Sequence, residues 1–382
     1  MTNPTCNICA SQISEQFYNS GQSGSLTSLN RIVEVSTIVR YCSSCRHIQT
    51  DPTFDTAAYY DTDYDILIES EEDDQIYKVI EGKPVFRTDH QVEVLLEKLT
   101  LKKGSRLLDY GCAKSSTFRN LLQKRPDLDL NLFDVSERYV PFWSSFLTKD
   151  KWATYTPPSA WDSSFDVITS FFAFEHIEKP GKALRDLSRL LNKGGVFYCV
   201  VPNILTNIAD LVVVDHLNHF TKDSLLKMCS DAGFTQIDID SEIHTSALVI
   251  TATKNSDLDS SARLEEEDIQ SKLVNMSKFW SSALERTRQF ESSLDASSEI
   301  AIYGAGFYAA FITAALSEPG RIKYYIDQNP HLEGRTMNEK PIIHPKNFSA
   351  DVQALFVGLN PDHARDIIKQ LEALQGLKTF FL

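Results

Sequence analysis

Apolar residues recur along residues 100–255 in the pattern of strands that alternate with helices. Short apolar runs predict buried strands at residues 106–110, 128–133, 165–170 and 196–201. The helix that begins at Pro180 places its leucines on one face, at Leu184, Leu187, Leu190 and Leu191. Strands that alternate with helices form mostly parallel sheets, so the pattern predicts an α/β protein with a central doubly wound sheet.

The same kind of pattern continues beyond both ends of this region. Residues 87–99 space their apolar side chains three, four and seven positions apart, which predicts an amphipathic helix packed on the sheet. Residues 263–290 predict a long helix, and residues 299–303 and 322–326 predict two strands of a second, Rossmann-like α/β sheet. A chain of 382 residues is too long for one hydrophobic core, so several domains are expected.

The first strand of the central region ends in a tight turn of small residues that leads into a helix. Asp109 closes the strand, and Gly111 and Ala113 lie in the turn. Doubly wound proteins hold a nucleotide or cofactor at such a strand–turn–helix junction. Asp134 ends the second strand, where a carboxylate can accept hydrogen bonds from the hydroxyls of a ribose.

Two Cys-x-x-Cys pairs near the N-terminus predict a closed, structural zinc site with ligands Cys6, Cys9, Cys42 and Cys45. In a reducing compartment such pairs favour metal over disulfides. Residues 33–41 alternate apolar and polar side chains, which predicts a strand leading into the second pair. Neither pair opens a helix in a βαβ unit, so a redox role is not expected.

Net charge and hydropathy limit the classes of partner. The formal net charge is −14, and an acidic chain lacks the basic face that binds nucleic acid or anionic membranes. The first residues lack the pattern of a signal peptide. The longest mostly apolar run, residues 303–316, is too short to cross a bilayer. We therefore expect a cytoplasmic protein with no nucleic-acid or membrane partner, present as a monomer or a homodimer.

Candidate acid–base residues lie beyond the fourth strand. Asp215 directly precedes His216, and an adjacent carboxylate can fix the tautomer of a histidine and tune its pKa. His219 follows three residues later. The alternative is that Thr221 caps the next helix and both histidines only pack at its start. Upstream, Tyr60 and Tyr64 lie in an acidic, tyrosine-rich segment that is either a lid carrying a phenol to the site or a solvated loop.

The second α/β sheet carries its own candidate ligand site. Gly304 and Gly306 form a Gly-x-Gly turn between a strand and a helix, and Asp327 ends the following strand. A helix N-terminus with exposed amides suits a phosphate, and the acid suits a ribose. The ligand is then a dinucleotide or a nucleotide sugar. The alternative is that the glycines only let the helix pack closely on the strand.

Five ordered blocks resemble class I S-adenosylmethionine-dependent methyltransferases: Leu-Asp-Tyr-Gly-Cys-Ala (108–113), Phe-Asp-Val (165–167), Phe-Glu-His-Ile (174–177), Leu-Asn-Lys-Gly-Gly (191–195) and Val-Pro-Asn (201–203). The resemblance implies that Asp109 and Gly111 line the methionine side of the cofactor and that Asp134 holds its ribose. We also assign Ala113, Val135, Phe171 and Phe172 to the cofactor, and Asn203 to the substrate. Ala113 and Ser115 replace family glycines; we expect the turn to tolerate Ala113 if its φ is negative.

The order of a four-cysteine zinc domain, a methyltransferase core and a C-terminal Gly-Ala-Gly unit resembles the sugar C-methyltransferase family. The resemblance implies a nucleotide-linked 4-keto-6-deoxy sugar, methylated at the carbon next to the ketone. It also implies that the terminal units grip this substrate and that His216, or a neighbour, is the base. The chain departs from the family where Asp215 replaces glutamate, His219 replaces tyrosine and Val213 lacks a hydroxyl.

These observations predict five segments: a zinc-binding domain (1–52), a lid or connector (53–86), the methyltransferase domain (87–255), a helical linker (256–298) and a C-terminal Rossmann-like domain (299–382). Three other functions stay open. One is an O- or N-methyltransferase on a saccharide or small-molecule precursor. Another is a binding protein without methyl transfer. The third is a nicotinamide enzyme that uses the Gly304 turn.

Overall fold

The structure is a computed structural model that describes residues 4–21, 24–53, 59, 74–80, 83–254, 268–349 and 351–382. The chain folds into two compact units. The first comprises Met1–Gln16, Val39–Asp210 and Asp215–Ile269, and the second comprises Phe17–Ile38, Leu211–Val214 and Gln270–Leu382. Residues 17–38 and 211–214 thus group with the C-terminal part of the chain, a division that cuts across the segments expected from the sequence.

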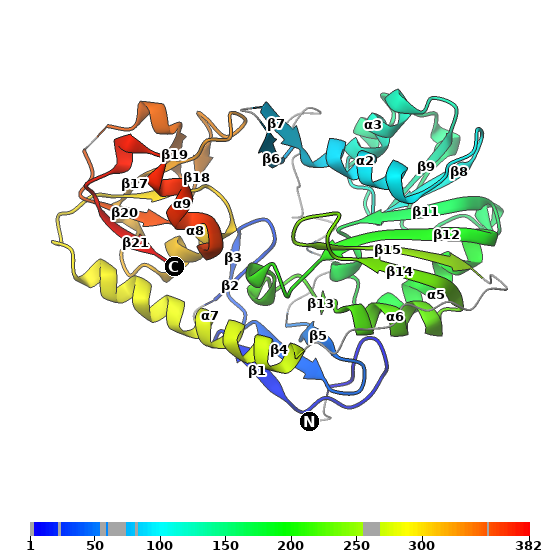
Figure 1. Ribbon diagram of the computed structural model, residues 1–382, viewed down its shortest axis with the longest axis horizontal. Coiled ribbons are helices and arrows are strands. Elements are labelled where there is room, and N and C mark those ends of the chain that lie inside the picture. The colour runs from blue at the N-terminus through cyan, green and yellow to red at the C-terminus, as the bar shows by residue number, and fades with distance from the viewer. Residues whose placement is uncertain are drawn as a thin grey trace. The chain divides into compact units, whose positions relative to one another are not determined.

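The first unit is built on a seven-stranded mixed sheet in the order β10-β9-β8-β11-β12-β15-β14 (Figure 1). β10, β9, β8, β11 and β12 run parallel, and β15 and β14 are antiparallel additions at the end. The strands are β8 (Arg106–Tyr110), β9 (Asp129–Asp134), β10 (Trp152–Thr154), β11 (Phe165–Phe171), β12 (Leu191–Pro202), β14 (Phe234–Asp240) and β15 (Ala247–Lys254). The predicted doubly wound core is confirmed.

Helices cover both faces of this sheet, as Figure 1 shows. On one face lie α2 (Arg87–Lys98), α3 (Ser116–Lys124) and α4 (Val140–Trp143), and on the other lie α5 (Pro180–Leu190) and α6 (Lys222–Asp231). Each face has its own cluster of buried apolar side chains, with Phe118 and Leu121 in the first and the α5 leucines in the second. Thr221 caps α6 with a reciprocal capping box to Ser224, which agrees with the capping part of the alternative interpretation.

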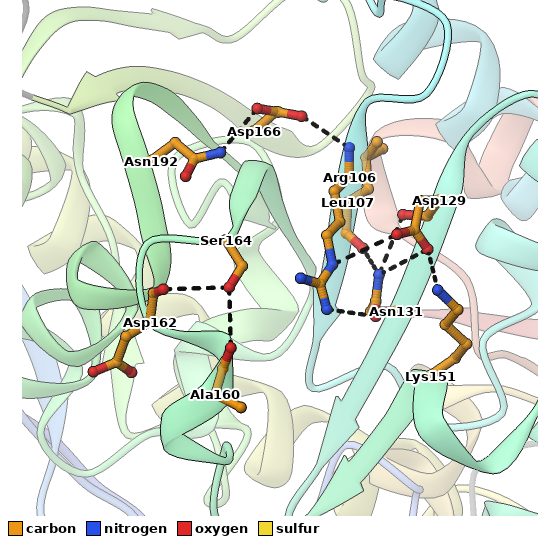
Figure 2. A network of polar contacts seen from close by, with 10 residues as sticks. All are labelled: Arg106, Leu107, Asp129, Asn131, Lys151, Ala160, Asp162, Ser164, Asp166 and Asn192. Carbon is orange, nitrogen blue, oxygen red and sulfur yellow. Dashed lines mark hydrogen bonds and ion pairs between the residues drawn. The ribbon is translucent and has the colours of Figure 1, made fainter.

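A polar network ties the amino ends of the parallel strands together (Figure 2). The Asp166 carboxylate accepts a hydrogen bond from the backbone N–H of Arg106 (2.9 Å) and another from the Asn192 amide (3.0 Å). Lys151 pairs with Asp129 at 2.7 Å. Because Asp109 and Asp134 stand at the opposite, carboxyl ends of β8 and β9, this network fixes the strand register and leaves the other edge for a ligand.

Smaller strands accompany the main sheet in the first unit. β4 (Ile38–Cys42) pairs antiparallel with β5 (His47–Thr50), and β5 pairs antiparallel with β13 (Asn218–His219). β6 (Ile76–Ile80) and β7 (Lys83–Phe86) also pair antiparallel and precede α2. The continuous strand predicted for residues 33–41 is wrong: residues 34–37 separate β3 (Ile32–Val33) from β4.

The second unit holds a six-stranded sheet in the order β18-β19-β17-β16-β20-β21, parallel except for β18. Its elements are β16 (Ile300–Tyr303), β17 (Ile322–Ile326), β18 (Thr336–Met337), β19 (Lys340–Ile343), β20 (Ala354–Val357), β21 (Lys378–Phe381), α7 (Ile269–Ser292), α8 (Phe307–Ala315) and α9 (Pro361–Lys369), together with β1 (Gln16–Asn19) and β2 (Ser25–Leu26), which pairs with β3. The Trp280 ring of α7 stacks on Tyr308 of α8, with ring centroids 5.9 Å apart. The predicted second α/β sheet is therefore present, and no helix among the described residues has the length and apolar character needed to cross a membrane.

Candidate functional site

The turn after β8 is held in left-handed backbone conformations. Gly111 has φ +73°, and a Cβ atom there would lie 2.7 Å from the Cβ of Ala173, so only glycine fits. Ala113 has φ +44° and Ser115 has φ +57°. The condition under which the turn was expected to tolerate Ala113, a negative φ, is therefore not met. An L-residue in this region costs about 1 kcal/mol, so the turn is strained at two positions where related turns carry glycine.

Two buried carboxylates flank this turn. Thr169 donates a hydrogen bond to Asp109 (2.9 Å), and Asp134 accepts one from the backbone N–H of Ala113 (2.8 Å) and one from Ser136 (3.2 Å). Burial raises the pKa of Asp109 to about 7 and the pKa of Asp134 to about 6. Asp134 therefore both closes the turn and presents an acid at the end of β9, where a ribose would lie.

A cavity of about 660 Å³ opens above the carboxyl ends of β8, β9 and β11. All seven residues that the sequence assigned to the cofactor line it: Asp109, Gly111, Ala113, Asp134, Val135, Phe171 and Phe172. Cavities of this volume enclose ligands of drug size. The structure thus brings together side chains spread over more than sixty positions of the sequence, in a cavity at the strand ends where doubly wound proteins bind nucleotide-like ligands.

Further lining residues come from α2 and the segment before β6, and the sequence analysis missed them. They are Asp74, Gln75, Arg87, Thr88 and Gln91. The guanidinium carbon of Arg87 lies 3.8 Å from the centroid of the Phe172 ring, a cation–π contact at the cavity wall. Phe172 itself has φ +53°, so its ring is held in place by an uncommon backbone conformation. The proposed lid residues Tyr60 and Tyr64 lie outside the described residues.

His216 and His219 share one buried carboxylate, which belongs to Asp210. The Nδ1 atom of His216 lies 2.5 Å from one Asp210 oxygen, and the Nδ1 atom of His219 lies 2.7 Å from the other. Burial alone would raise the pKa of Asp210, but the two imidazoles hold this pKa well below its usual value. Burial opposes the charged form of His216, yet Asp210 outweighs it and raises the pKa of His216 to about 9.

The carboxylate that pairs with Nδ1 of His216 is thus that of Asp210, where the sequence suggested Asp215. The carboxylate of Asp215 is fully buried and lies 3.7 Å from Nδ1 of His176, which donates a hydrogen bond to the Asp215 backbone carbonyl (3.0 Å). The rings of His176 and His216 meet edge to face at 4.7 Å. His176 lines the cavity, so it connects His216 to the cofactor side of the site.

Glu175 completes this group beside the cavity. Its carboxylate, 1% exposed, lies with ring nitrogens of His176 and His216 inside a span of 4.8 Å. Burial raises the pKa of Glu175 to about 7 and lowers the pKa of His176 to about 4. In the sequence, Glu175 and His176 stand out only as part of the Phe-Glu-His-Ile block. The short 3₁₀ turn that carries them, Phe174–His176, is what aims both at His216.

The four cysteines predicted as zinc ligands come together in the first unit. Their sulfur atoms lie within 4.8 Å of one another, with Cys6–Cys45 and Cys9–Cys42 pairs at 3.5 Å. All four are free thiols. Four sulfurs that each lie about 2.3 Å from a zinc ion are about 3.8 Å apart in a tetrahedron, so the cluster fits that ion.

The predicted substrate residues have clear local roles. Asn203 accepts a hydrogen bond from the N–H of Leu205 (3.1 Å) in the turn after β12. Gly304 has φ +93°, and a Cβ atom there would lie 2.5 Å from the carbonyl oxygen of Gly358, so close packing alone requires this glycine. Gly306, at the start of α8, faces open space. Asp327 accepts a hydrogen bond from the backbone N–H of Ala305 in the turn (2.8 Å). Asp134 at the end of β9 accepts the same kind of bond from Ala113.

Comparison with known proteins gives a family match for the central region and partial structural similarities. Residues 87–239 match the family described as methyltransferase domain. Among solved structures, the CurJ carbon methyltransferase is 19% identical, covers 42% of this chain and 51% of its own, and has a TM-score of 0.35. PigF with SAH is 15% identical, with coverage of 43% and 54% and a TM-score of 0.37. An S-adenosylmethionine dependent methyltransferase from Mesorhizobium loti is 16% identical, with coverage of 43% and 98% and a TM-score of 0.35.

The chain spans about half the length of the first two of these structures. The family match covers the strands that form the parallel part of the main sheet, together with the glycine turn and the acid at the end of β9. The chain therefore contains a class I S-adenosylmethionine-dependent methyltransferase domain at residues 87–239, which follows an N-terminal cluster of four cysteines.

Proposed function

We propose that the protein is an S-adenosylmethionine-dependent C-methyltransferase that acts on a nucleotide-linked 4-keto-6-deoxy sugar at the carbon next to the ketone. The observation that carries the proposal is the pairing of His216 with the buried Asp210 beside the cofactor cavity. A carbon acid needs a strong, oriented base, and a histidine held by a buried carboxylate is such a base. The order of the domains, which resembles that of sugar C-methyltransferases, supports the choice of substrate.

When bound, S-adenosylmethionine supplies an electrophilic methyl group on a sulfonium. Asp109 and Asp134 would hold its methionine and ribose portions at the ends of β8 and β9. Asp210 fixes the Nδ1 proton of His216, which leaves the Nε2 lone pair for the substrate C–H proton. His216 would keep the proton that it removes, and the substrate enolate would be the nucleophile for the methyl group. The cavity walls contribute by aligning the reacting atoms.

The cysteine cluster and the second sheet have supporting roles in this proposal. Zinc held by Cys6, Cys9, Cys42 and Cys45 would be structural, because four thiolates leave no open coordination position. The α8 N-terminus, with the open space at Gly306 and the acid Asp327, would form a nucleotide site of the second unit. Mass spectrometry of nucleotide sugars retained by the purified protein would identify that ligand.

The test of the proposal is the His216→Ala variant. It should lose methyl transfer to the keto sugar while it binds S-adenosylmethionine with the affinity of the unmodified protein in calorimetry, because His216 is not among the residues that line the cofactor cavity. A variant that transfers methyl groups at the unmodified rate would show that His216 is not the base. Methylation of an oxygen instead of carbon, seen in the product's fragmentation pattern, would favour the O-methyltransferase alternative.

A further inference from the structure

A continuous chain of hydrogen bonds runs from β5, in the small sheet next to the cysteine cluster, to His216. Thr50 Oγ1 lies 2.9 Å from Nε2 of His219. Nδ1 of His219 lies 2.7 Å from Asp210, and the other oxygen of Asp210 lies 2.5 Å from Nδ1 of His216. Thr50, His219 and Asp210 are each at most 1% exposed, so water does not compete for these bonds.

The acceptor and donor roles along this chain follow from the chemistry of its members. An ionised carboxylate only accepts, so both Nδ1 atoms carry protons that they donate to Asp210. In an imidazole whose Nδ1 carries the proton the lone pair is on Nε2, so in that tautomer the hydroxyl of Thr50 donates to His219.

Backbone pairing holds Thr50 in this position. β13 pairs antiparallel with β5, which places His219 opposite Ile48, and the N–H of Thr50 donates to the carbonyl of Leu217 (3.2 Å). Thr50 follows Cys45 by five residues in the chain. The N-terminal module, defined as residues 4–16 and 39–53 with the four cysteines, therefore presents a side chain to the acid–base group from a fixed strand. A fixed strand aims side chains more accurately than a loop.

We propose that Thr50 and His219 are positioning residues for His216. They act by holding the Asp210 carboxylate in one orientation, with one of its oxygens already hydrogen-bonded to His219. The proposal rests on the proposed role of His216 as the base. It assigns the N-terminal module a part in tuning the reaction in addition to metal binding. In this proposal His219 acts on Asp210 and does not contact the substrate.

The chain of hydrogen bonds predicts in which direction the titration midpoint of His216 shifts when one of its links is removed. Asp210, Asp215 and Glu175 face His216 as acids, and His176 faces it as a second imidazole. Without the Thr50 hydroxyl, His219 donates a weaker bond to Asp210, because hydrogen bonds in a chain polarise one another. Asp210 then holds the His216 proton more tightly, and the titration midpoint of His216 rises. General loosening with entry of water would instead move the midpoint down, toward that of free histidine.

The experiment is a nuclear magnetic resonance titration of the full chain labelled with ¹⁵N-histidine. Nine histidines are present, and the spectrum of His216→Gln identifies the signal of interest. The variants are Thr50→Val, which removes the hydroxyl, Thr50→Ser, which restores it, and His219→Leu, which removes the whole link. Thr5→Val is the matched control, because Thr5 is exposed in the same module.

Thr50→Val and His219→Leu should each raise the His216 midpoint by about half a pH unit. Thr50→Ser and Thr5→Val should leave it unchanged. An unchanged midpoint in both Thr50→Val and His219→Leu, or a fall in either, would overturn the proposal. The titration needs no substrate, so its result is independent of whether His216→Ala loses methyl transfer.

Discussion

The pairing of His216 with Asp210 predicts a large effect of a single atom change, Asp210→Asn. The substitution keeps the shape of the side chain but replaces one acceptor oxygen with an N–H₂ group. Both Nδ1 atoms that face Asp210 are donors, so the new amide opposes one of them. One imidazole must then change its tautomer or turn away. If that imidazole is His216, its Nε2 no longer presents a lone pair to the substrate.

The expected losses of stability and of kcat follow from the burial of Asp210 and from the number of hydrogen bonds that it accepts. Asp210 is 1% exposed and accepts two bonds, and a hydrogen bond to a charged group contributes about 1.5–3 kcal/mol. Asparagine retains one acceptor, so the free energy of unfolding should fall by about 2 kcal/mol. The carboxylate that raises the pKa of His216 to about 9 is also lost, so that pKa falls. Because a positioned base contributes about 10²–10⁴ to the rate, kcat should fall about 10³-fold.

The assay is methyl transfer to the keto sugar, followed by mass spectrometry, beside thermal unfolding of each variant. Asp215→Asn is the matched control, because it removes a buried carboxylate charge near the same histidines but keeps the backbone carbonyl that accepts the hydrogen bond from His176. It should reduce kcat no more than about tenfold, because Asp210 still accepts the hydrogen bond from Nδ1 of His216. If Asp215→Asn lost more activity than Asp210→Asn, the assignment of Asp210 as the orienting carboxylate would be refuted.

Four further predictions concern the cofactor turn, the metal site and the pH dependence. Gly111→Ala should weaken S-adenosylmethionine binding at least tenfold in calorimetry, since φ is +73° and the added Cβ meets Ala173; unchanged affinity would contradict this. Ala113→Gly should raise the free energy of unfolding, measured in urea, by about 0.5 kcal/mol. This value is the backbone strain that glycine relieves minus the extra conformational entropy that glycine gives the unfolded chain, and a loss of stability would count against a strained turn. Removing bound metal with a chelator should lower Tm, as Cys42→Ser should, and an unchanged Tm in both would argue against a structural metal. Finally, kcat/KM should rise with pH up to about 9, because the base must lose its proton to act; a plateau already above pH 6.5 would show a different base.

Local patterns in the sequence predict most of the regular structure. The helix at residues 87–99 and the strand at residues 322–326 appear within one residue of their predicted bounds. Both are read from the spacing of apolar residues, which depends on nearby positions alone. The strand predicted across residues 33–41 fails because its alternation spans two short strands, and alternation cannot show which partner each residue will pair with.

The residues of the candidate site likewise fall into those that local sequence patterns predict and those that they do not. The cofactor residues follow the ends of strands, and the carboxyl ends of parallel strands share one edge, so Asp109 and Asp134 could be placed together from the sequence. Asp210 could not, because an adjacent acid such as Asp215 looks like the better partner of His216 until the backbone is known. The available signal was that Asp210 is the only other acid between Pro202 and His216. Thr50 gives no signal at all, since its contact to His219 depends on pairing between segments far apart in the chain.

The central claim is that His216 forms an enolate at the sugar carbon next to the ketone, and deuterium exchange tests it most directly. The protein is incubated in D₂O with a nucleotide-linked 4-keto-6-deoxyhexose and S-adenosylhomocysteine, so that proton removal can occur without methyl transfer. The account predicts that one deuterium enters at the carbon next to the ketone with the unmodified protein and that none enters with His216→Ala. Methyl transfer to the same sugar in the presence of S-adenosylmethionine, with no exchange at that carbon under any condition, would contradict it.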